Sequence, residues 1–135
     1  MIKDIPIRKV EDVLVAIMPQ PHDPEAPTWE VFLINLKNDP IHNVLVASRG
    51  YGELGGESVN TSVLRHFFEK IPPLSYHKVE QIQTQVFGLT NEYMVTFTYD
   101  DFMFDKKYTF TSGSIDEDNF TQIPLINRSG VVIGT

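Results

Sequence analysis

The chain has 135 residues, a formal net charge of −7 and no cysteine. Its length is typical of one domain, so we expect a single domain over residues 1–135. The lack of cysteine excludes disulfides, thiolate zinc sites, iron–sulfur clusters and cysteine nucleophiles, and the acidic balance disfavours nucleic acid as a partner because phosphate would be repelled.

The first third of the sequence predicts three strands. Residues 13–18 are a β-branched-rich run that is apolar on both faces, and residues 29–36 repeat this pattern, so both are expected to be well-covered strands. A polar turn at residues 37–40 leads into a third predicted strand at residues 43–49. A loop is predicted between the first two strands, because the intervening segment contains four prolines, Pro19, Pro21, Pro24 and Pro27.

Residues 50–60 are rich in glycine and acidic side chains and predict a flexible hairpin loop. Gly50, Gly52 and Gly55 match the G-x-G-x-x-G pattern of dinucleotide-binding proteins. That chemistry needs a helix that begins within the motif, so that its N-terminal amides face the pyrophosphate. Here any helix would begin near Thr61, several residues too late, and the acidic side chains would repel phosphate. The pattern therefore predicts a loop.

Residues 61–71 fit both a helix and a strand. Their apolar residues have the i, i+1, i+4, i+5, i+8 spacing of a helix, for which Thr61 would be the N-cap and Pro72 the stop. A strand would place Arg65 and Glu69 on an otherwise apolar face. The neighbouring segments are predicted strands, so local pattern and context disagree.

The clearest hairpin lies in the second half of the chain. Residues 92–99 and residues 102–111 each alternate between apolar and polar side chains, and Asp100 and Asp101 turn the chain between them. This pattern predicts one buried face and one largely wet face. Lys106 falls on the apolar face, where we expect a bulge or a strand end.

The last part of the chain predicts short elements. Ser114 and Glu117 have capping-box spacing, which indicates one turn of helix, and residues 120–125 and 131–133 are expected to be short closing strands. Taken together, the segments predict an all-β fold, an antiparallel β-sandwich of about seven to nine strands with room for one short helix.

No residue pattern predicts a metal or a catalytic site. The histidines lack ligand spacing, the acidic clusters at residues 100–105 and 116–119 lack the steps of a calcium loop, and there is no G-x-S-x-G elbow. We therefore expect no metal, no cofactor and no catalytic residue that the sequence alone reveals. The histidines concerned are His22, His42, His66 and His77.

One surface patch is predicted around the end of the third strand. Arg49 and Tyr51 end this strand and open the glycine-rich loop, and Arg65 and His66 follow soon after it. Arginine and tyrosine are over-represented among the residues that anchor protein interfaces. Arg49, Tyr51, Arg65 and His66 are therefore the predicted binding residues. The alternative is a strand end whose long side chains shield the sheet edge.

Several stretches resemble a family of small bacterial proteins of uncharacterised function. They lie at residues 29–35, 44–52, 61–68 and 91–93, so the resemblance covers most of the chain. It implies an immunoglobulin-like sandwich and favours a strand at residues 61–71. Some members are labelled phenylalanyl-tRNA synthetase alpha subunit, but this chain is too short and too acidic to be a functional aminoacyl-tRNA synthetase.

These observations predict a binding or protein-interaction module without catalytic activity, whose partner would be a protein. The alternatives are a small enzyme whose site forms only in the tertiary structure and a structural subunit that forms a homodimer through a strand edge. The charged, proline-broken N-terminus and the lack of a long apolar window predict a cytoplasmic protein with no membrane partner.

Overall fold

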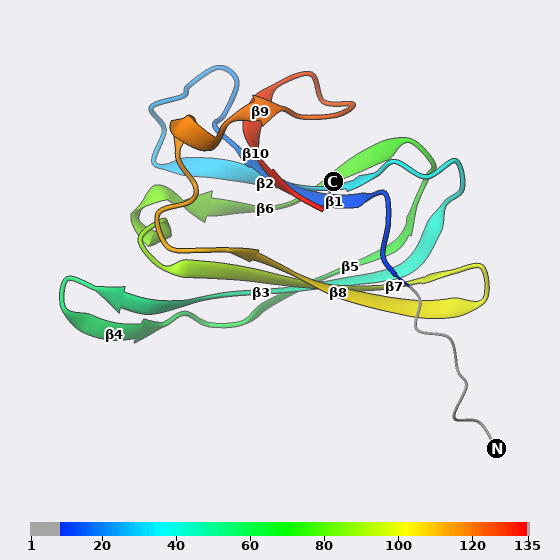
Figure 1. Ribbon diagram of the computed structural model, residues 1–135, viewed down its shortest axis with the longest axis horizontal. Coiled ribbons are helices and arrows are strands. Elements are labelled where there is room, and N and C mark those ends of the chain that lie inside the picture. Colours follow the sequence, from blue (N-terminus) through cyan, green and yellow to red (C-terminus); the bar gives the residue numbers. More distant parts are fainter. Residues whose placement is uncertain (1–8, 135) are drawn as a thin grey trace.

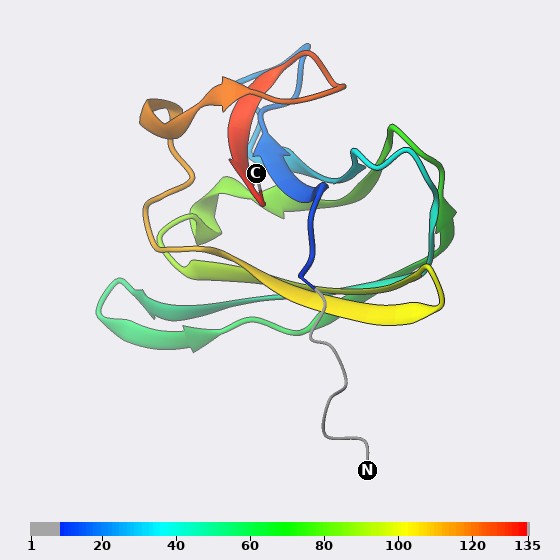
Figure 2. The same ribbon diagram turned by 45° about the vertical axis from the view of Figure 1, so that its right-hand side comes forward.

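The computed structural model describes residues 9–134. The charged N-terminal stretch from which a cytoplasmic location was predicted lies outside the described residues. The chain folds into two antiparallel sheets that face each other, with strands of the first sheet above those of the second in two views (Figures 1 and 2). The predicted all-β class is confirmed, but the described residues contain ten strands, more than the seven to nine expected.

The first sheet has the strand order β6-β2-β1-β10-β9, and its central strands are the apolar runs at the start of the chain. β1 is buried along its whole length because both of its faces are covered, as the two-sided apolar pattern predicted. Its five strands are β1 (Val13–Met18), β2 (Thr28–Asn35), β6 (Ser75–Gln83), β9 (Thr121–Gln122) and β10 (Ser129–Ile133).

The second sheet is built on the long strand β3, which pairs with β7 on one side and with β4 and then β5 on the other. β8 pairs with β7 and forms the far edge of this sheet. Its five strands are β3 (Ile41–Leu54), β4 (Glu57–Asn60), β5 (Leu64–Ile71), β7 (Thr90–Tyr99) and β8 (Phe102–Phe110).

The main core lies between the two sheets, where alternate residues of facing strands meet. It includes Val15 and Leu33 from the first sheet and Val46, Val95 and Tyr108 from the second. Period-two alternation puts every second side chain of a strand on the core face, which confirms the buried face predicted for β7 and β8. The outer face of the first sheet carries a second, smaller apolar cluster, composed of Leu14, Ala16, Met18, Phe32, Ile34 and Ile123.

The segment with the helical apolar pattern is a strand. Residues 64–71 form β5, which pairs with β3 from Ile41 to Ser48. Two apolar side chains that suggested a helix lie on opposite faces of this strand: Phe67 is 63% exposed on the outer face, and Phe68 packs on the core. Sheet pairing therefore overrides the local helical spacing.

The loop predicted at residues 50–60 is mostly strand. β3 continues to Leu54, and β4 begins at Glu57, so the two form a hairpin with a two-residue turn. Gly55 and Gly56 occupy this turn with φ of 62° and 83°, the backbone conformation that a tight hairpin turn requires and that glycine adopts without strain. The hairpin extends beyond the body of the sandwich, at the left in Figure 1.

Two smaller expectations are corrected. Lys106 lies at neither a bulge nor a strand end, because β7 and β8 pair without interruption; its ammonium lies 5.1 Å from the ring centroid of Tyr108 on the sheet edge.

The predicted helical turn exists as a 3₁₀ helix, η2 (Glu117–Asn119), but its cap is Asp116, whose side chain accepts from the Asp118 amide, and Ser114 is not the cap.

The remaining short elements are a second 3₁₀ helix, η1 (Thr84–Val86), and the shortened strand β9, which covers only part of the strand predicted at residues 120–125. Between residues 9 and 134, no helix has the length and apolarity needed to cross a membrane.

Candidate functional site

A β-bulge on the edge strand β6 turns a glutamate into the sandwich. Val31 of β2 pairs with Glu80, but the next residue, Phe32, pairs with Lys78, so Val79 is an extra residue in β6. An extra residue shifts the alternation by one and re-aims the side chains that follow it. As a result Val79 is buried in the core, and the adjacent Glu80 also has a side chain that is only 11% exposed.

Glu80 is hydrogen-bonded to three strands of the opposite sheet. The Ser48 hydroxyl of β3 donates to its Oε1 over 2.9 Å, and the Tyr93 hydroxyl of β7 donates to its Oε2 over 3.1 Å. Nε2 of His66 in β5 lies 2.7 Å from Oε1, and this ring nitrogen is the donor because an ionised carboxylate only accepts. Glu80 therefore connects the edge of the first sheet to the second sheet.

Burial keeps the Tyr93 hydroxyl protonated. The pKa of Tyr93 is raised well above its ordinary value, first because the side chain is buried and then because the Glu80 charge and hydrogen bond oppose ionisation. Tyr93 is therefore a hydrogen-bond donor to Glu80 at every physiological pH. A buried carboxylate held by such donors is fixed in position and partly compensated for its loss of water.

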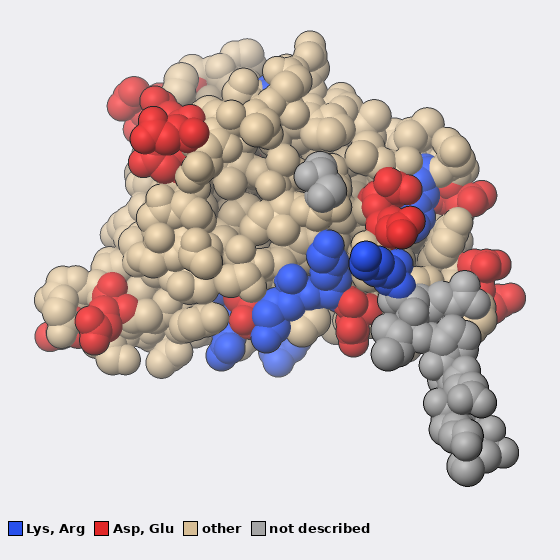
Figure 3. Space-filling view, viewed as in Figure 1, with Lys and Arg blue, Asp and Glu red and all other residues tan. Residues whose placement is uncertain are grey.

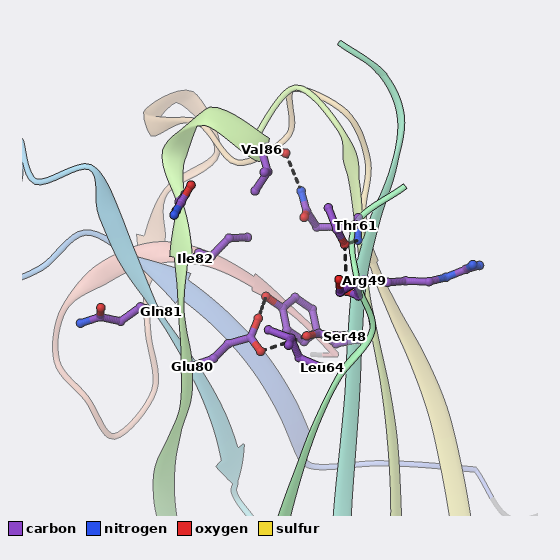
Figure 4. Close-up of a pocket in the computed structure, with 13 residues that line it drawn as sticks. Ser48, Arg49, Thr61, Leu64, Glu80, Gln81, Ile82 and Val86 are labelled. Atoms are coloured by element: carbon purple, nitrogen blue, oxygen red, sulfur yellow. Dashed lines mark hydrogen bonds between the residues drawn. The ribbon is translucent and has the colours of Figure 1, made fainter. Parts of the chain in front are cut away.

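The Glu80 network borders a groove between β6 and the strands β3, β5 and β7. Figure 4 shows the Glu80 and Ser48 side chains pointing toward one another across it. The groove has a volume of about 280 Å³, near the lower end for small-ligand pockets. Apolar contacts are provided by Leu64, Ile82 and Val86.

The end of the groove near η1 is shaped by a glycine. Gly50 occupies an inward-facing position of β3, and a Cβ there would lie 3.0 Å from Oδ1 of Asn91 and 3.3 Å from Cγ2 of Thr61. The Gly50 amide donates to the Thr61 hydroxyl over 2.7 Å. Asn91 donates to the carbonyls of Val86 and Leu89. The lack of a side chain at Gly50 thus leaves Oδ1 of Asn91 facing the groove.

The structure divides the predicted patch between two faces of the second sheet. Arg49 and Tyr51 lie together on the outer face, with the guanidinium 4.9 Å from the ring centroid, and Arg65 is exposed on the neighbouring strand. His66 points the other way, to Glu80. Figure 4 shows the Arg49 side chain extending away from the groove, which it lines only near its backbone.

The outer face of the second sheet carries Arg49, Arg65 and Lys107. Glu92 is held there by Arg49 at 3.0 Å and Lys107 at 3.5 Å. Figure 3 shows Lys and Arg side chains beside β8, at the edge of this sheet, with acidic side chains among them. On the outer face itself Leu45 is 39% exposed and Phe67 63% exposed. Glu69 and Asp105 are exposed at alternate positions of the same strands as Arg65 and Lys107. This face therefore carries charges of both signs beside exposed apolar side chains, and it is separate from the groove.

Sequence reasoning missed the residue at the centre of the network. Glu80 lies in a strand that was not predicted, since Val79 and Ile82 are three residues apart and break the period-two pattern. That break marks the bulge, and it was the only signal available. Ser48 and Tyr93 fell inside predicted strands, but a serine and a tyrosine on a core face do not by themselves indicate a site.

The side-chain donors around the groove are used within the protein, in contrast to the donors of an acyl- or phosphoryl-transfer site. Such reactions need preorganised donors aimed at a developing negative charge. Here the Ser48 and Tyr93 hydroxyls both donate to Glu80, and the Asn91 amide donates to backbone. Ser48 and His66 both contact Glu80, and no hydrogen bond joins them to each other in the part of the chain described. Within residues 9–134, no group of three or more potential metal ligands comes together.

No protein-family model matches the chain, and no curated protein has a detectably similar sequence.

Proposed function

We propose that the protein is a binding module whose site is the groove between β6 and the second sheet. The observation that carries this proposal is Glu80, a carboxylate turned inward by a bulge and fixed by three donors beside an open cavity of about 280 Å³. A fixed polar group next to apolar walls is the usual composition of a small-ligand pocket. Edge bulges that re-aim side chains are common next to functional sites.

An immunoglobulin-like layout is part of the same proposal. The order β6-β2-β1 faces the order β5-β3-β7-β8, which supports an assignment of β3, β7 and β8 to the C, F and G strands of that architecture. β9 and β10 would then be additions beside β1. The resemblance to small bacterial proteins is compatible with this layout, and the predicted cytoplasmic location belongs to the same set of proposals.

The test is a screen of small molecules by amide chemical-shift mapping on the full chain. Ligands are expected to shift amides of Ser48, Gly50, Glu80 and Ile82. Leu64→Trp, at a half-exposed position on the groove, should weaken this binding at least tenfold because the indole occupies part of the cavity. Leu74→Trp, at a similarly exposed position outside the groove, is the matched control. A screen in which every ligand shifts other amides contradicts the proposal.

A second candidate is a protein-interaction surface on the outer face of the second sheet. Its supporting observation is Phe67, 63% exposed beside Leu45 and Arg65 on a face that also carries Arg49 and Lys107. Arg65 and Phe67 lie exposed together, whereas Arg49 and Lys107 are paired with Glu92, so the partner would supply a carboxylate to Arg65 and an apolar contact to Phe67. Arg65→Glu should abolish capture of such a partner, and Lys70→Glu, the same charge change at an exposed position on the other face of β5, is the control. Retained capture by Arg65→Glu removes this candidate.

A further inference from the structure

The hydroxyl donors that face the groove are already used. The Ser48 hydroxyl has one proton, and it is donated to Glu80. The Tyr93 hydroxyl is likewise donated to Glu80. At the groove margin the Thr61 hydroxyl donates to the Ser62 carbonyl and accepts from the Gly50 amide. These hydroxyls can therefore offer a ligand only lone pairs.

The Asn91 side chain likewise offers the groove only a hydrogen-bond acceptor. Its two N–H groups are directed to the carbonyls of Val86, at 2.9 Å, and Leu89, at 3.2 Å. Its oxygen accepts no hydrogen bond from the described residues, and it lies next to the space left by the missing side chain of Gly50. A carbonyl oxygen of this kind has two lone pairs, so Asn91 offers the groove a second fixed acceptor.

Glu80 completes the acceptor set. A carboxylate can accept about four hydrogen bonds, and three are made here: two to Oε1, from Ser48 and His66, and one to Oε2, from Tyr93. The remaining acceptor position belongs to Oε2. Arg49 is the one cationic residue among those that line the groove in the described part of the chain, and its guanidinium points outward onto Tyr51 and Glu92. The groove thus combines one negative charge with acceptors.

We propose that the groove binds a small organic cation, an ammonium or amidinium group on a short apolar body. Its N–H groups would donate to Oε2 of Glu80 and Oδ1 of Asn91, and its apolar part would contact Leu64, Ile82 and Val86. This inference rests on the proposed binding function and specifies its ligand class. The exposed side chains of Ser62, Gln81 and Gln83 at the margin can donate or accept, so the selection for charge comes from the buried groups.

An anionic ligand would bind weakly in this groove. It would lie next to the Glu80 carboxylate without a free buried side-chain donor, and the whole protein carries a net charge of −7. Charge-assisted hydrogen bonds to a carboxylate are about twice as strong as neutral ones. The groove should therefore rank ligands of one shape by charge, with the cation first and the anion last.

The experiment uses three ligands of nearly one shape: benzamidine, benzamide and benzoate. Each is titrated into the full chain, and affinity is read from the amide shifts of Ser48, Gly50, Ile82 and Asn91. We expect benzamidine to bind at least tenfold more tightly than benzamide, and benzoate to give no shifts in the groove. Because this ranking uses the unmodified chain, it does not depend on the folding of a variant.

A pair of variants tests the role of the carboxylate. Glu80→Gln should weaken benzamidine binding about tenfold or more, because it replaces one acceptor by a donor and removes the charge. Glu57→Gln makes the same change in net charge at an exposed position of β4 and should leave the affinity unchanged.

The outcomes separate the two proposals. If benzamide or benzoate shifts the groove amides as strongly as benzamidine, the cation assignment is overturned while ligand binding in the groove stands. If none of the three shifts these amides at millimolar concentration, the cation assignment fails, and the screen with the Leu64→Trp and Leu74→Trp pair decides the binding function on its own. Equal weakening by Glu80→Gln and Glu57→Gln would show a general charge effect and would also overturn the assignment.

Discussion

Replacing Glu80 by alanine should destabilise the fold through the donors that it leaves behind. The hydroxyls of Ser48, 5% exposed, and Tyr93, 1% exposed, would lose their acceptor. A buried donor without a partner costs about 1–3 kcal/mol, and the adjacent groove admits water, which places both hydroxyls near the lower end of that range. His66 is more exposed and adds little. Relief of the buried charge offsets part of the loss. We therefore expect the free energy of unfolding to fall by about 1–2 kcal/mol.

The assay is urea unfolding at neutral pH, in which the transition midpoint and slope give the free energy of unfolding. The Glu80–Tyr93 contact is isolated by a double-mutant cycle of Glu80→Ala with Tyr93→Phe, and the expected coupling is about 1 kcal/mol. Glu57→Ala, which removes an exposed carboxylate, is the control and should change stability by less than about 0.5 kcal/mol. A Glu80→Ala protein as stable as this control, or a cycle without coupling, would refute the reasoning.

Three further predictions concern the burial or exposure of single side chains. Because burial raises the pKa of both Tyr93 and Tyr108, the native state keeps two protons that the unfolded state loses near pH 10. The free energy of unfolding should therefore keep its full value below about pH 10 and fall above it by up to about 2.7 kcal/mol per pH unit. Urea unfolding across this pH range measures the change, and a midpoint that does not depend on pH contradicts the prediction. Asn35→Ala should cost about 2–4 kcal/mol in thermal or urea unfolding, since the fully buried amide donates to the carbonyls of Asp39 and Pro72, and a loss below 1 kcal/mol is the adverse result. Phe67→Thr should cost less than about 0.5 kcal/mol because the ring is exposed, whereas a larger loss would indicate that β5 does not present this face to solvent.

The strands that could be predicted are those in which one physical pattern dominates. β1 and β2 were predicted because residues 13–18 and 29–36 are apolar on both faces, a pattern that suits a covered strand. β7 and β8 were predicted because their alternation is regular, and their uninterrupted pairing is its consequence. In these segments local pattern and tertiary environment agree.

The wrong or missing predictions fall in segments where the local sequence pattern favours one structure and the tertiary environment favours another. In the segment at residues 50–60, glycines suggested a loop, but only Gly55 and Gly56 serve the turn, while Gly50 leaves space for the groove. β6 was missed because Val79 is an extra residue in its pairing with β2, so its apolar residues do not alternate. A bulge is recognised from the partner strand, which a single segment does not contain.

The candidate site could not be assembled from the sequence because its parts are distant along the chain. Ser48 is 32 residues from Glu80, and Tyr93 is 13 residues from it. His66 was selected for its nearness in sequence to Arg49, but neighbouring residues of a strand point to opposite faces, and Arg65 and His66 accordingly separate. The patch prediction grouped residues of β3 and β5, which the structure pairs, without resolving which face each side chain occupies.

The most direct test of the account is a crystal structure of the chain with benzamidine. It should place the amidinium in the groove within hydrogen-bond distance of Glu80 Oε2 and Asn91 Oδ1, with Ser48 and Tyr93 still donating to Glu80. Benzamidine bound elsewhere would contradict the inferred ligand class, and a Glu80 side chain turned out to solvent would contradict the bulge-directed geometry on which that inference rests.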